Sequence, residues 1–395
     1  MIVSFLHLLY HLYVTHKQLR LGIFILATAL FASFAKADIH LVPEHYKTIQ
    51  AAASAASDGD EIHVMPGEYD GFEVFVDITV IGLGLSPHDT IITGLVRSYE
   101  QMHISNLHLT GGWVGNGTLG GDSMSNCVVS AVGVEHSLGF VSFLRCDFIM
   151  CQSGALDLTL GYYTIEDCTF EENSTDASGG AISVDDSYVR VHSCDFRDNS
   201  AALHGGAIDA ASPSLELLVT NSSFEGNSAG GLAGAIWYQA GNAGSCHIES
   251  STFKNNSSGS AAGAVYIRNG QFLDVPGYVV SCEFKHNTSE DIPESAALCF
   301  VVQDIQPLPY VGYSSFCGNA PADFHGEYIT IRDNMFNKEC LCLADVNGDG
   351  VLTPADFTAW INAFNNNLPE CDQNLDGGCT PTDFTAWIAN FNTGC

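Results

Sequence analysis

The feature that most constrains the fold is a short frame that recurs through the middle of the chain. The frame reads apolar–x–x–small–x–apolar, as in residues 104–109, 165–170 and 331–336. Successive copies are about 20 to about 30 residues apart, which is the size of one turn of a solenoid. A strand too short to be stable alone gains stability by stacking on its copy in the next turn. The last residue of the frame falls at Leu109, Val129, Phe148, Phe170, Phe196, Phe224, Phe253, Phe284, Phe316 and Phe336.

Two further columns follow the same repeat. Asn comes three residues after the frame Phe, at Asn173, Asn199, Asn227, Asn256, Asn287 and Asn319. We predict a structural ladder here, because stacked amides satisfy one another and the turn backbone, and because Asn tolerates a left-handed φ. The small position of the frame is expected to hold buried fillers. It carries Cys127, Cys146, Cys168, Cys194 and Cys282, with Ser222, Ser251 and Ser314 in other copies.

These signatures support a resemblance to known repeat proteins. Phe-x-x-Asn followed by Gly-Gly-Ala-Ile, as at residues 179–182 and 205–208, resembles the polymorphic outer membrane protein repeats of bacterial surface proteins. Residues 47–69 look like the first coil of pectin-lyase-like right-handed β-helices. The predicted fold is all-β, a right-handed parallel β-helix of about ten coils over residues 38–336. A short helix at 49–56 is the candidate cap for its open edge.

The last fifty residues contain one acidic pattern twice. Oxygen side chains stand at positions 1, 3, 5, 9 and 12, and Gly stands at position 6, where a calcium loop turns sharply. Hard cations such as Ca²⁺ need several oxygens at short range, so two calcium sites are predicted. With the residues at position 7 included, the predicted ligands are Asp345, Asn347, Asp349, Val351, Thr353 and Asp356, and then Asp372, Asn374, Asp376, Gly378, Thr380 and Asp383.

Each loop runs into a predicted helix. Thr353 and Thr380 can cap the helix N-terminus, and Pro354 and Pro381 suit its first position. Aromatic and aliphatic residues then follow helical spacing, with Trp360 and Trp387 expected in the core of a small α module rather than stacked on sugars. They are Phe357, Trp360, Ile361 and Phe364, and then Phe384, Trp387, Ile388 and Phe391.

This loop–helix pair resembles a dockerin, the duplicated calcium module that binds a cohesin partner. It is most similar to the variant ending in Gly-Cys on secreted planctomycete proteins, the Gly-Cys-type dockerin domain-anchored proteins, since this chain ends Gly394-Cys395. The resemblance implies an anchoring module at 337–395, held by a cohesin-like or cell-surface partner. Five cysteines fit an oxidising compartment, and four of them could pair and leave Cys395 as the attachment point. They are Cys340, Cys342, Cys371, Cys379 and Cys395.

The N-terminus is predicted to be a secretory signal peptide over residues 1–37. It has a basic stretch at 16–20, an apolar stretch at 21–31, and the small-residue cleavage motif 35–37. A retained membrane anchor is the alternative. No later segment is long and apolar enough to span a bilayer, so the mature chain is expected to be extracellular or anchored at the cell surface, without a transmembrane segment.

The charge of the chain excludes several partners. Three of its 13 Lys and Arg lie in the signal segment, which leaves 10 basic residues against 45 acidic ones, a balance of −35. Phosphate backbones and anionic lipids would be repelled by such a surface, so no nucleic acid partner is expected. Basic residues are also too scarce to line a groove for an acidic polysaccharide.

Carboxylates at Asp185, Asp186 and Asp209 are the candidates for catalysis, because hydrolases of this fold need two or three that lie close together. Arg190, His192, Arg197 and His204 come from the same two predicted coils. The alternative is a solvated acidic face.

Three functions follow from this sequence. The first is a secreted, calcium-anchored rod with a structural or adhesive role. The second is a glycoside hydrolase or polysaccharide lyase, and the third is a non-catalytic protein that binds polysaccharide along its flank. Fold alone does not decide among them.

Overall fold

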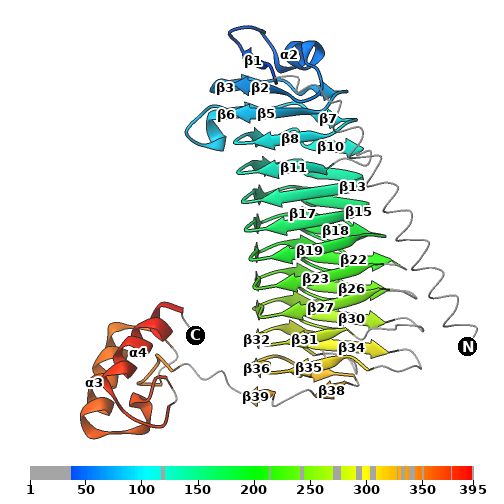
Figure 1. Cartoon of the computed structure of the whole chain (residues 1–395). Coiled ribbons are helices and arrows are strands. Elements are labelled where there is room, and N and C mark those ends of the chain that lie inside the picture. Colours follow the sequence, from blue (N-terminus) through cyan, green and yellow to red (C-terminus); the bar gives the residue numbers. More distant parts are fainter. Residues whose placement is uncertain are drawn as a thin grey trace, which may run out of the picture.

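The chain forms a long stack of parallel coils followed by a pair of helices (Figure 1). The predicted signal segment lies outside the described residues except for Ala37. Among the described residues, no helix is long and apolar enough to cross a membrane. The computed structural model describes residues 37–116, 121–212, 215–240, 244–269, 277–290, 296–302, 308–326, 328–330, 334–337, 343–348, 351–374 and 376–393.

The largest sheet has 22 strands and consists of two parallel ladders. We call the line where they meet the corner. The two ladders fuse because β13 and β15 run through the corner without a break and pair with strands of both. The first ladder holds β4 (Glu73–Val74), β7 (Val96–Ser98), β10 (Trp113–Asn116), β13 (Val134–Leu144), β15 (Leu156–Glu166), β18 (Ile182–Asp185), β22 (Ile208–Ser212), β26 (Ile236–Ala240), β30 (Val265–Asn269), β34 (Leu298–Val302) and β37 (Phe324–His325). The second ladder shares β13 and β15 and adds β1 (Ile39–Val42), β2 (Asp60–Val64), β5 (Ile78–Gly82), β8 (Met102–Ser105), β11 (Gly121–Ser125), β19 (Tyr188–His192), β23 (Glu216–Thr220), β27 (Ser245–Glu249), β31 (Tyr278–Val280), β35 (Tyr310–Gly312) and β38 (Ile329–Thr330).

The first apolar residue of a frame, such as Ile104 or Ile165, lies in the second ladder, whereas the last residue of each of the ten frames lies in a second sheet of 12 strands. Its strands are β3 (Gly67–Tyr69), β6 (Thr90–Ile92), β9 (His108–Leu109), β12 (Val128–Ser130), β14 (Asp147–Ile149), β16 (Thr169–Glu171), β20 (Asp195–Arg197), β24 (Ser223–Glu225), β28 (Thr252–Lys254), β32 (Glu283–Lys285), β36 (Ser315–Cys317) and β39 (Met335–Asn337). A third sheet of five strands closes the coil with β17 (Ser174–Thr175), β21 (Ser200–Ala201), β25 (Ser228–Ala229), β29 (Ser257–Ser258) and β33 (Thr288–Ser289).

The interior is a set of side-chain columns running along the stack. The frame phenylalanines from Phe148 to Phe336 stack face to face, and those of Phe196 and Phe224 are 4.5 Å apart and 2° from parallel. The phenylalanines from Phe148 to Phe316 are fully buried, as are most aliphatic residues of the two ladders. Identical side chains meet because every strand pairs in register with its copy, which makes the core continuous from coil to coil.

Coils that carry the frame have one sharp bend inside the frame and another just after it, and both bends contain a residue with a left-handed backbone conformation. Asp167 has φ 53° and Glu172 has φ 54°, and equivalent positions recur in neighbouring coils. This corrects one detail of the sequence analysis. The ladder asparagines do not themselves take a left-handed φ; the residue before each of them does, whether it is Glu172, Asp198 or Asn255.

The residue after each left-handed bend is buried, and its backbone N–H would be orphaned without a side-chain acceptor. Asn supplies that acceptor at one bend: the Asn199 N–H and Nδ2 both donate to Oδ1 of Asn227, at 3.1 and 2.9 Å. The small frame residue supplies it at the other, where the Cys194 N–H donates to Ser222 Oγ at 3.2 Å. The predicted structural ladder is therefore confirmed, and the buried cysteines and serines also satisfy backbone donors.

The N-terminal end of the stack carries the expected cap. Helix α2 (Ile49–Ala55) begins at Thr48, whose side chain accepts from the Ala51 N–H. Its apolar residues Ile49 and Ala52 are buried against the first coil, so the helix covers an edge that would otherwise be open. A short 3₁₀ turn, η1 (Pro87–Asp89), precedes β6.

The C-terminal part consists of α3 (Pro354–Asn366), the 3₁₀ turn η2 (Pro369–Cys371) and α4 (Pro381–Thr393). Helix α3 starts with the predicted cap, since Thr353 accepts from the Ala355 N–H and Asp356 forms the reciprocal half of a capping box. Both tryptophans are buried, and Trp387 Nε1 donates to the Ala344 carbonyl at 3.2 Å. Their predicted core role is confirmed.

Candidate functional site

The three predicted catalytic carboxylates lie on two adjacent coils, but not in one cleft. Asp185 ends β18, and Asp209 projects outward from β22. Asp186 stands at the corner with φ 43° and accepts a hydrogen bond from the Ser212 hydroxyl. The structure therefore brings Asp185 and Asp209 within electrostatic reach of each other, with Asp157 of the coil before as a third member.

Asp209 has an unusual environment. Its pKa is raised to about 7: burial is the main cause, a hydrogen bond from Ser178 partly offsets it, and the neighbouring Asp185 charge adds to the rise. Its Oδ1 atom is buried without a hydrogen-bond partner. A carboxyl that is partly protonated near neutral pH is suited to acid–base chemistry. Desolvation alone produces the same raised pKa at a site without such chemistry.

The basic residues of the same coils point elsewhere. Arg197 lies on the 12-stranded sheet and pairs with Asp195 at 2.9 Å. His192, on the second ladder, bonds through Nδ1 to the Thr220 hydroxyl at 2.7 Å. Only His204 comes near Asp209: its ring lies 4.7 Å from that of Trp237, which pairs in register with Asp209. The predicted grouping is thus spread over several faces.

The second predicted calcium loop is folded around its own oxygens. Asp372 accepts from the N–H groups of Asp376 and Gly377 at 3.1 and 2.9 Å, and Asn374 Oδ1 also accepts from Asp376. Gly377 has φ 89°, the turn expected at position 6. Loop positions 1, 3 and 5 thus converge on one turn of backbone, as a cation loop requires.

Position 12 closes this loop. Asp383 is fully buried and accepts from the N–H groups of Gln373, Asn374 and Thr380 at 2.8, 3.2 and 2.7 Å. Burial raises the pKa of Asp383, but these N–H donors outweigh it and hold the pKa below its usual range. Among the described residues, no three His, Cys, Asp or Glu side chains form a metal site on their own. The loop would need its amide, hydroxyl and carbonyl oxygens as well.

The first loop is described only in part, because Asp349 lies outside the described residues. Asp356 repeats the arrangement of Asp383: it is fully buried and accepts from the Thr353 N–H at 2.8 Å and the Asn347 N–H at 3.3 Å. Burial raises the pKa of Asp356, and the hydrogen bonds from Thr353 and Asn347 reverse the shift and leave it lowered.

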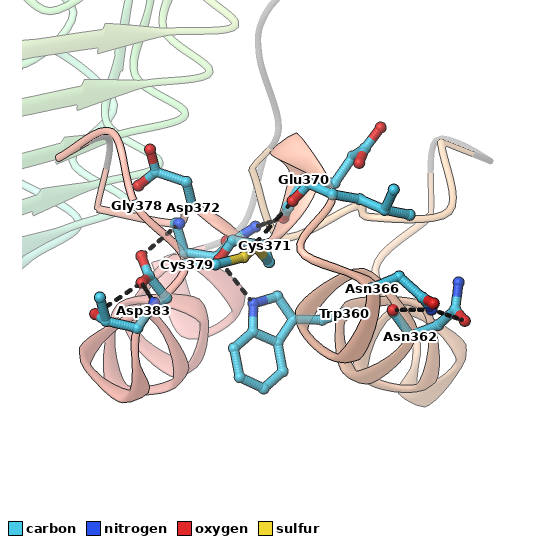
Figure 2. The surroundings of a disulfide bond; sticks show 12 residues. Trp360, Asn362, Asn366, Glu370, Cys371, Asp372, Gly378, Cys379 and Asp383 are labelled. Carbon is cyan, nitrogen blue, oxygen red and sulfur yellow. Dashed lines mark hydrogen bonds between the residues drawn. A yellow bond between two sulfur atoms is a disulfide. The ribbon is translucent and has the colours of Figure 1, made fainter.

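A disulfide joins Cys371 to Cys379 across the second loop (Figure 2). Trp360 Nε1 donates to the Cys371 carbonyl at 3.2 Å, which ties the bridge to the core of the module. The predicted anchoring residue Cys395, together with Cys340 and Cys342, lies outside the described residues.

The structure also shows a site that the sequence analysis missed, a column of exposed aromatic rings on the second ladder. Phe140, Tyr162 and Tyr188 pair in register. The Phe140 and Tyr162 rings are 53% and 57% exposed and stack at 5.0 Å, and Tyr188 follows at 5.8 Å. A signal was present, because each ring stands eight residues before a frame Phe, at Phe148, Phe170 and Phe196.

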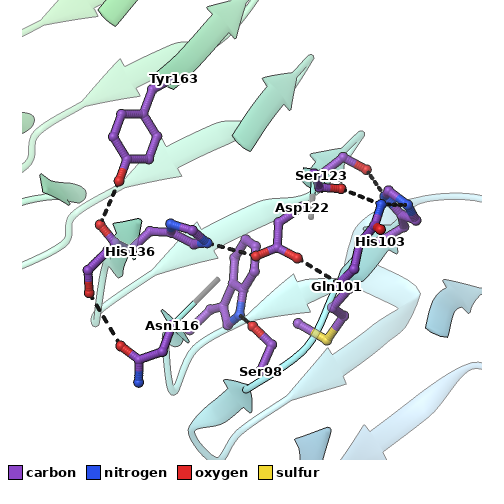
Figure 3. A network of polar contacts seen from close by, with 12 residues as sticks. Ser98, Gln101, His103, Asn116, Asp122, Ser123, His136 and Tyr163 are labelled. Atoms are coloured by element: carbon purple, nitrogen blue, oxygen red, sulfur yellow. Dashed lines mark hydrogen bonds and ion pairs between the residues drawn. The ribbon is translucent and has the colours of Figure 1, made fainter. Parts of the chain in front are cut away.

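A column of polar side chains runs beside these rings. Ser142 and Thr164 stand two residues further along the same strands and therefore face the same side. The column continues through Ser123 to His103, whose Nδ1 lies 2.6 Å from the Ser123 hydroxyl, and Gln101 Nε2 bonds to the same imidazole at 3.0 Å (Figure 3).

The aromatic and polar columns enclose a hollow of about 520 Å³. Gly121 lies in register with Phe140, where a larger residue would cover the outer face of the ring. A Cβ at Gly121 would come no closer than 4.0 Å to another atom. We call this hollow the aromatic groove; it is lined by His103, Gly121, Asp122, Ser123, Phe140, Val141, Ser142, Tyr162, Tyr163, Thr164 and Tyr188.

A buried contact between a histidine and an aspartate supports the floor of the groove. His136 Nε2 lies 2.7 Å from Asp122 Oδ2, and Asp122 Oδ1 accepts from the Met102 N–H at 2.7 Å (Figure 3). The Tyr163 hydroxyl donates to the carbonyl of His136 at 2.9 Å. Since these side chains are almost fully buried, they hold the strands beneath the groove in register.

Comparison with known proteins agrees with the stacked coils. Residues 100–292 match the family model described as a right handed beta helix region. Over these residues the chain is a right-handed β-helix. The match covers the coils that form the aromatic groove and the Asp185–Asp209 region. No curated protein matches the sequence.

Several solved structures resemble the β-helix. One is the catalytic domain of a GH87 α-1,3-glucanase in complex with nigerose, at 10% identity and TM-score 0.43, covering 76% of this chain and 66% of that one. This chain thus spans just under two thirds of that domain. Another is the A-module of the mannuronan C-5 epimerase AlgE6 of Azotobacter vinelandii, at 14% identity and TM-score 0.38, covering 73% and 94%. A third is a mannuronic acid specific polysaccharide family 6 lyase from human gut microbiota, at 10% identity and TM-score 0.28, covering 85% and 94%.

Proposed function

We propose that this protein is a secreted β-helix that binds a neutral polysaccharide along its flank and is held at the cell surface by its C-terminal module. The observation that carries the proposal is the aromatic groove. Exposed rings stacked in a row are unusual on a soluble surface, where large apolar groups cost hydration free energy unless they meet a ligand. Such sites combine apolar walls with a few placed polar groups.

The composition of the groove favours an uncharged glycan. Sugar rings present C–H faces that pack on aromatic rings and hydroxyls that bond to side chains such as Ser123, Ser142 and Thr164. Acidic side chains surround the hollow: Glu216 and Asp186 line an adjoining hollow of about 390 Å³. A polyuronate would be repelled by these carboxylates.

The test is affinity electrophoresis of the mature chain in gels that contain starch, laminarin, cellulose derivatives or polygalacturonate. We expect retardation by at least one neutral glucan and none by polygalacturonate. Phe140→Ala and Tyr162→Ala should abolish the retardation, and Gly121→Leu should do so by filling the groove, since its Cβ meets open space. Tyr313→Ala is the matched control, because that ring is 56% exposed elsewhere. Loss of retardation in the control, or retention in all three groove variants, would contradict the proposal.

The C-terminal module is proposed to be the calcium-dependent anchor. The oxygens of Asp372, Asn374, Asp376 and Asp383 would hold one ion in the second loop, and those of the first loop a second ion. Bound Ca²⁺ would supply the positive charge that lets these carboxylates sit together. Isothermal titration of the chelated protein with Ca²⁺ should show two sites, and Asp383→Asn should remove one. A flat titration of the wild-type protein would reject this part.

Attachment itself is proposed to occur through Cys395 or through a cohesin-like or other cell-surface partner that binds the module. Secretion is proposed to remove residues 1–37. The intact mass of the native protein tests both points. We expect an N-terminus at Asp38 and a modified Cys395; an unmodified Gly394-Cys395 end would leave only the non-covalent partner.

A polysaccharide-degrading enzyme is the second candidate, and Asp209 is the observation that favours it. A carboxyl with a pKa of about 7 beside the Asp185 carboxylate resembles the acid–base pair of glycoside hydrolases. Reducing ends released from a neutral glucan would indicate a hydrolase, and ultraviolet-absorbing unsaturated ends from a uronate polymer would indicate a lyase. Asp185→Ala and Asp209→Ala should each abolish such turnover in a rod that stays folded; turnover retained in both would exclude this pair.

A further inference from the structure

A second pair of exposed rings lies on the other side of the corner. Phe75 and Tyr99 follow directly after the paired residues Val74 and Ser98 of β4 and β7. The Phe75 ring is 62% exposed and the Tyr99 ring 38%, and the two stack at 4.8 Å and 5°. Neither ring lines the aromatic groove, although His103, which comes from the same coil as Tyr99, does.

Strand register places this pair in the column of residues directly across the corner from the groove rings. Ser98 pairs with Gly115, and the following residue, Asn116, pairs with Ser137 of the coil that carries Phe140. Phe75, Tyr99, Phe140, Tyr162 and Tyr188 therefore occur on five of six successive coils. Phe75 and Tyr99 lie on the first-ladder side of the corner, and Phe140, Tyr162 and Tyr188 lie on the second-ladder side. The coil between them has Asn116 and Gly121 at the two described positions beside the corner, and neither is aromatic.

Each ring has a polar partner across the corner on its own coil. Across the corner, Gln101 takes the position opposite Tyr99, Ser137 the position opposite Phe140, and Thr159 the position opposite Tyr162. Asp77 and Asp185 stand opposite Phe75 and Tyr188 in the same way. A surface that offers one ring and one hydrogen-bonding group per coil repeats along the axis with the coil spacing of about 4.8 Å.

We propose that these five rings form one continuous binding track, along which a single neutral glycan chain lies parallel to the axis of the β-helix. The inference rests on the proposed function and deepens it, since the ligand becomes an extended chain rather than a short oligosaccharide. Six coils span roughly 25 Å, so several sugar units are bound at once. Arg97, a cation on the strand that precedes Tyr99, lies 3.4 Å from Glu73. The exposed Asp77 and Asp185 add negative charge, so the track suits no polyanion.

The test uses a length series of oligosaccharides, from disaccharide to octasaccharide, of whichever neutral glucan retards the mature protein. Affinities are measured by isothermal titration for wild type, for Phe75→Ala/Tyr99→Ala, for Phe140→Ala/Tyr162→Ala and for the control Tyr313→Ala. We expect wild-type affinity to rise with chain length. Phe75→Ala/Tyr99→Ala should lower the affinity for the longest chain about tenfold and leave the shortest chain unchanged. Phe140→Ala/Tyr162→Ala should weaken all lengths.

Three results would overturn the track. If Phe75→Ala/Tyr99→Ala binds long chains like wild type while Phe140→Ala/Tyr162→Ala does not, the site ends at the groove and the proposed function stands. If the Phe75→Ala/Tyr99→Ala variant instead changes the mass measured by light scattering, those rings cover a second copy of the chain. If wild type binds no glucan, the proposed function fails together with the track. Unchanged melting temperatures show that the variants are folded.

Discussion

At the scale of single residues, the ladders explain why polar side chains sit inside this β-helix. Asn227 is fully buried, yet its amide oxygen accepts from the Asn199 backbone and amide, and its Nδ2 donates to the Phe196 carbonyl and to Asn256 at 3.0 and 2.9 Å. All its bonding capacity is used. A buried polar network of this kind is stabilising only while each member is satisfied.

Asn227→Ala should therefore be costly. It removes the acceptor of the Asn199 N–H and of one Asn199 Nδ2 hydrogen, and it removes a donor to the Phe196 carbonyl, so we expect a loss of about 3 kcal/mol in the free energy of unfolding. Chemical denaturation measures it. The adjacent Asn255 is exposed and has φ 56°, so Asn255→Gly is the control and should be nearly neutral. Equal stabilities of the two variants would show that the ladder is not a source of stability.

Asp209 predicts a pH dependence with a definite sign. Its folded pKa of about 7 lies above the ordinary value, so the folded state holds the proton more tightly and loses stability as pH rises from about 4 to about 7. Asp209→Asn removes this ionisation cost, which is up to about 4 kcal/mol above pH 7. The variant should melt higher than wild type at pH 8 and similarly at pH 4. Asp185→Asn serves as the comparison, and a gain for Asp209→Asn that is the same at both pH values would refute the assignment.

At the scale of elements, the two loop–helix units of the C-terminal module share one hydrogen-bonding arrangement. An aspartate in the first turn of each helix, Asp356 or Asp383, reaches back to the backbone N–H groups of its own loop. Loop and helix therefore order together, and the ionised carboxylate is the link.

The module should unfold in acid. The pKa values of Asp356 and Asp383 are lowered in the folded state, so their contribution is complete above about pH 4 and is lost as the pH falls through the folded pKa values. Because α3 and α4 are the longest described helices, the helical circular dichroism signal reports on the module. We expect that signal to fall below pH 4 in the chelated protein while the strand signal persists. A helical signal unchanged to pH 2 would contradict the mechanism.

At the scale of the whole molecule, the β-helix is quasi-one-dimensional, with each coil contacting its two neighbours. Its ends are then the vulnerable points, because unpaired strand edges recruit other chains. Helix α2 and its buried residues Ile49 and Ala52 protect the N-terminal end.

Ile49→Asp should detach this cap and expose the first coil. We expect a mature protein that self-associates, with a larger mass by light scattering, while the far coils stay folded. Ala51→Asp places the same charge on the exposed face of the helix and should remain monomeric. A monomeric Ile49→Asp protein with a normal melting temperature would mean that the edge needs no cover.

The repeat determined much of this protein without any tertiary information. A frame with a fixed interior pattern can bury its apolar residues only by stacking, so the ten frame strands, the Asn column, the cap helix and the two capped C-terminal helices all followed from local patterns. The C-terminal ligand set was predicted from spacing alone, and both the ligand set and its ion remain predictions.

Only the tertiary structure decided which outward side chains share a surface. Coil lengths vary, so chain spacing does not reveal that Phe75 and Tyr99 lie across the corner from the column of Phe140, or that Asp209 is half-buried while Asp186 is exposed. The interior is specified by the sequence because successive coils repeat apolar residues and hydrogen-bonding side chains at the same inward positions. The outward positions carry no pattern that every coil repeats. Sites on the outer surface therefore depend on the strand register, which decides which residues of separate coils become neighbours.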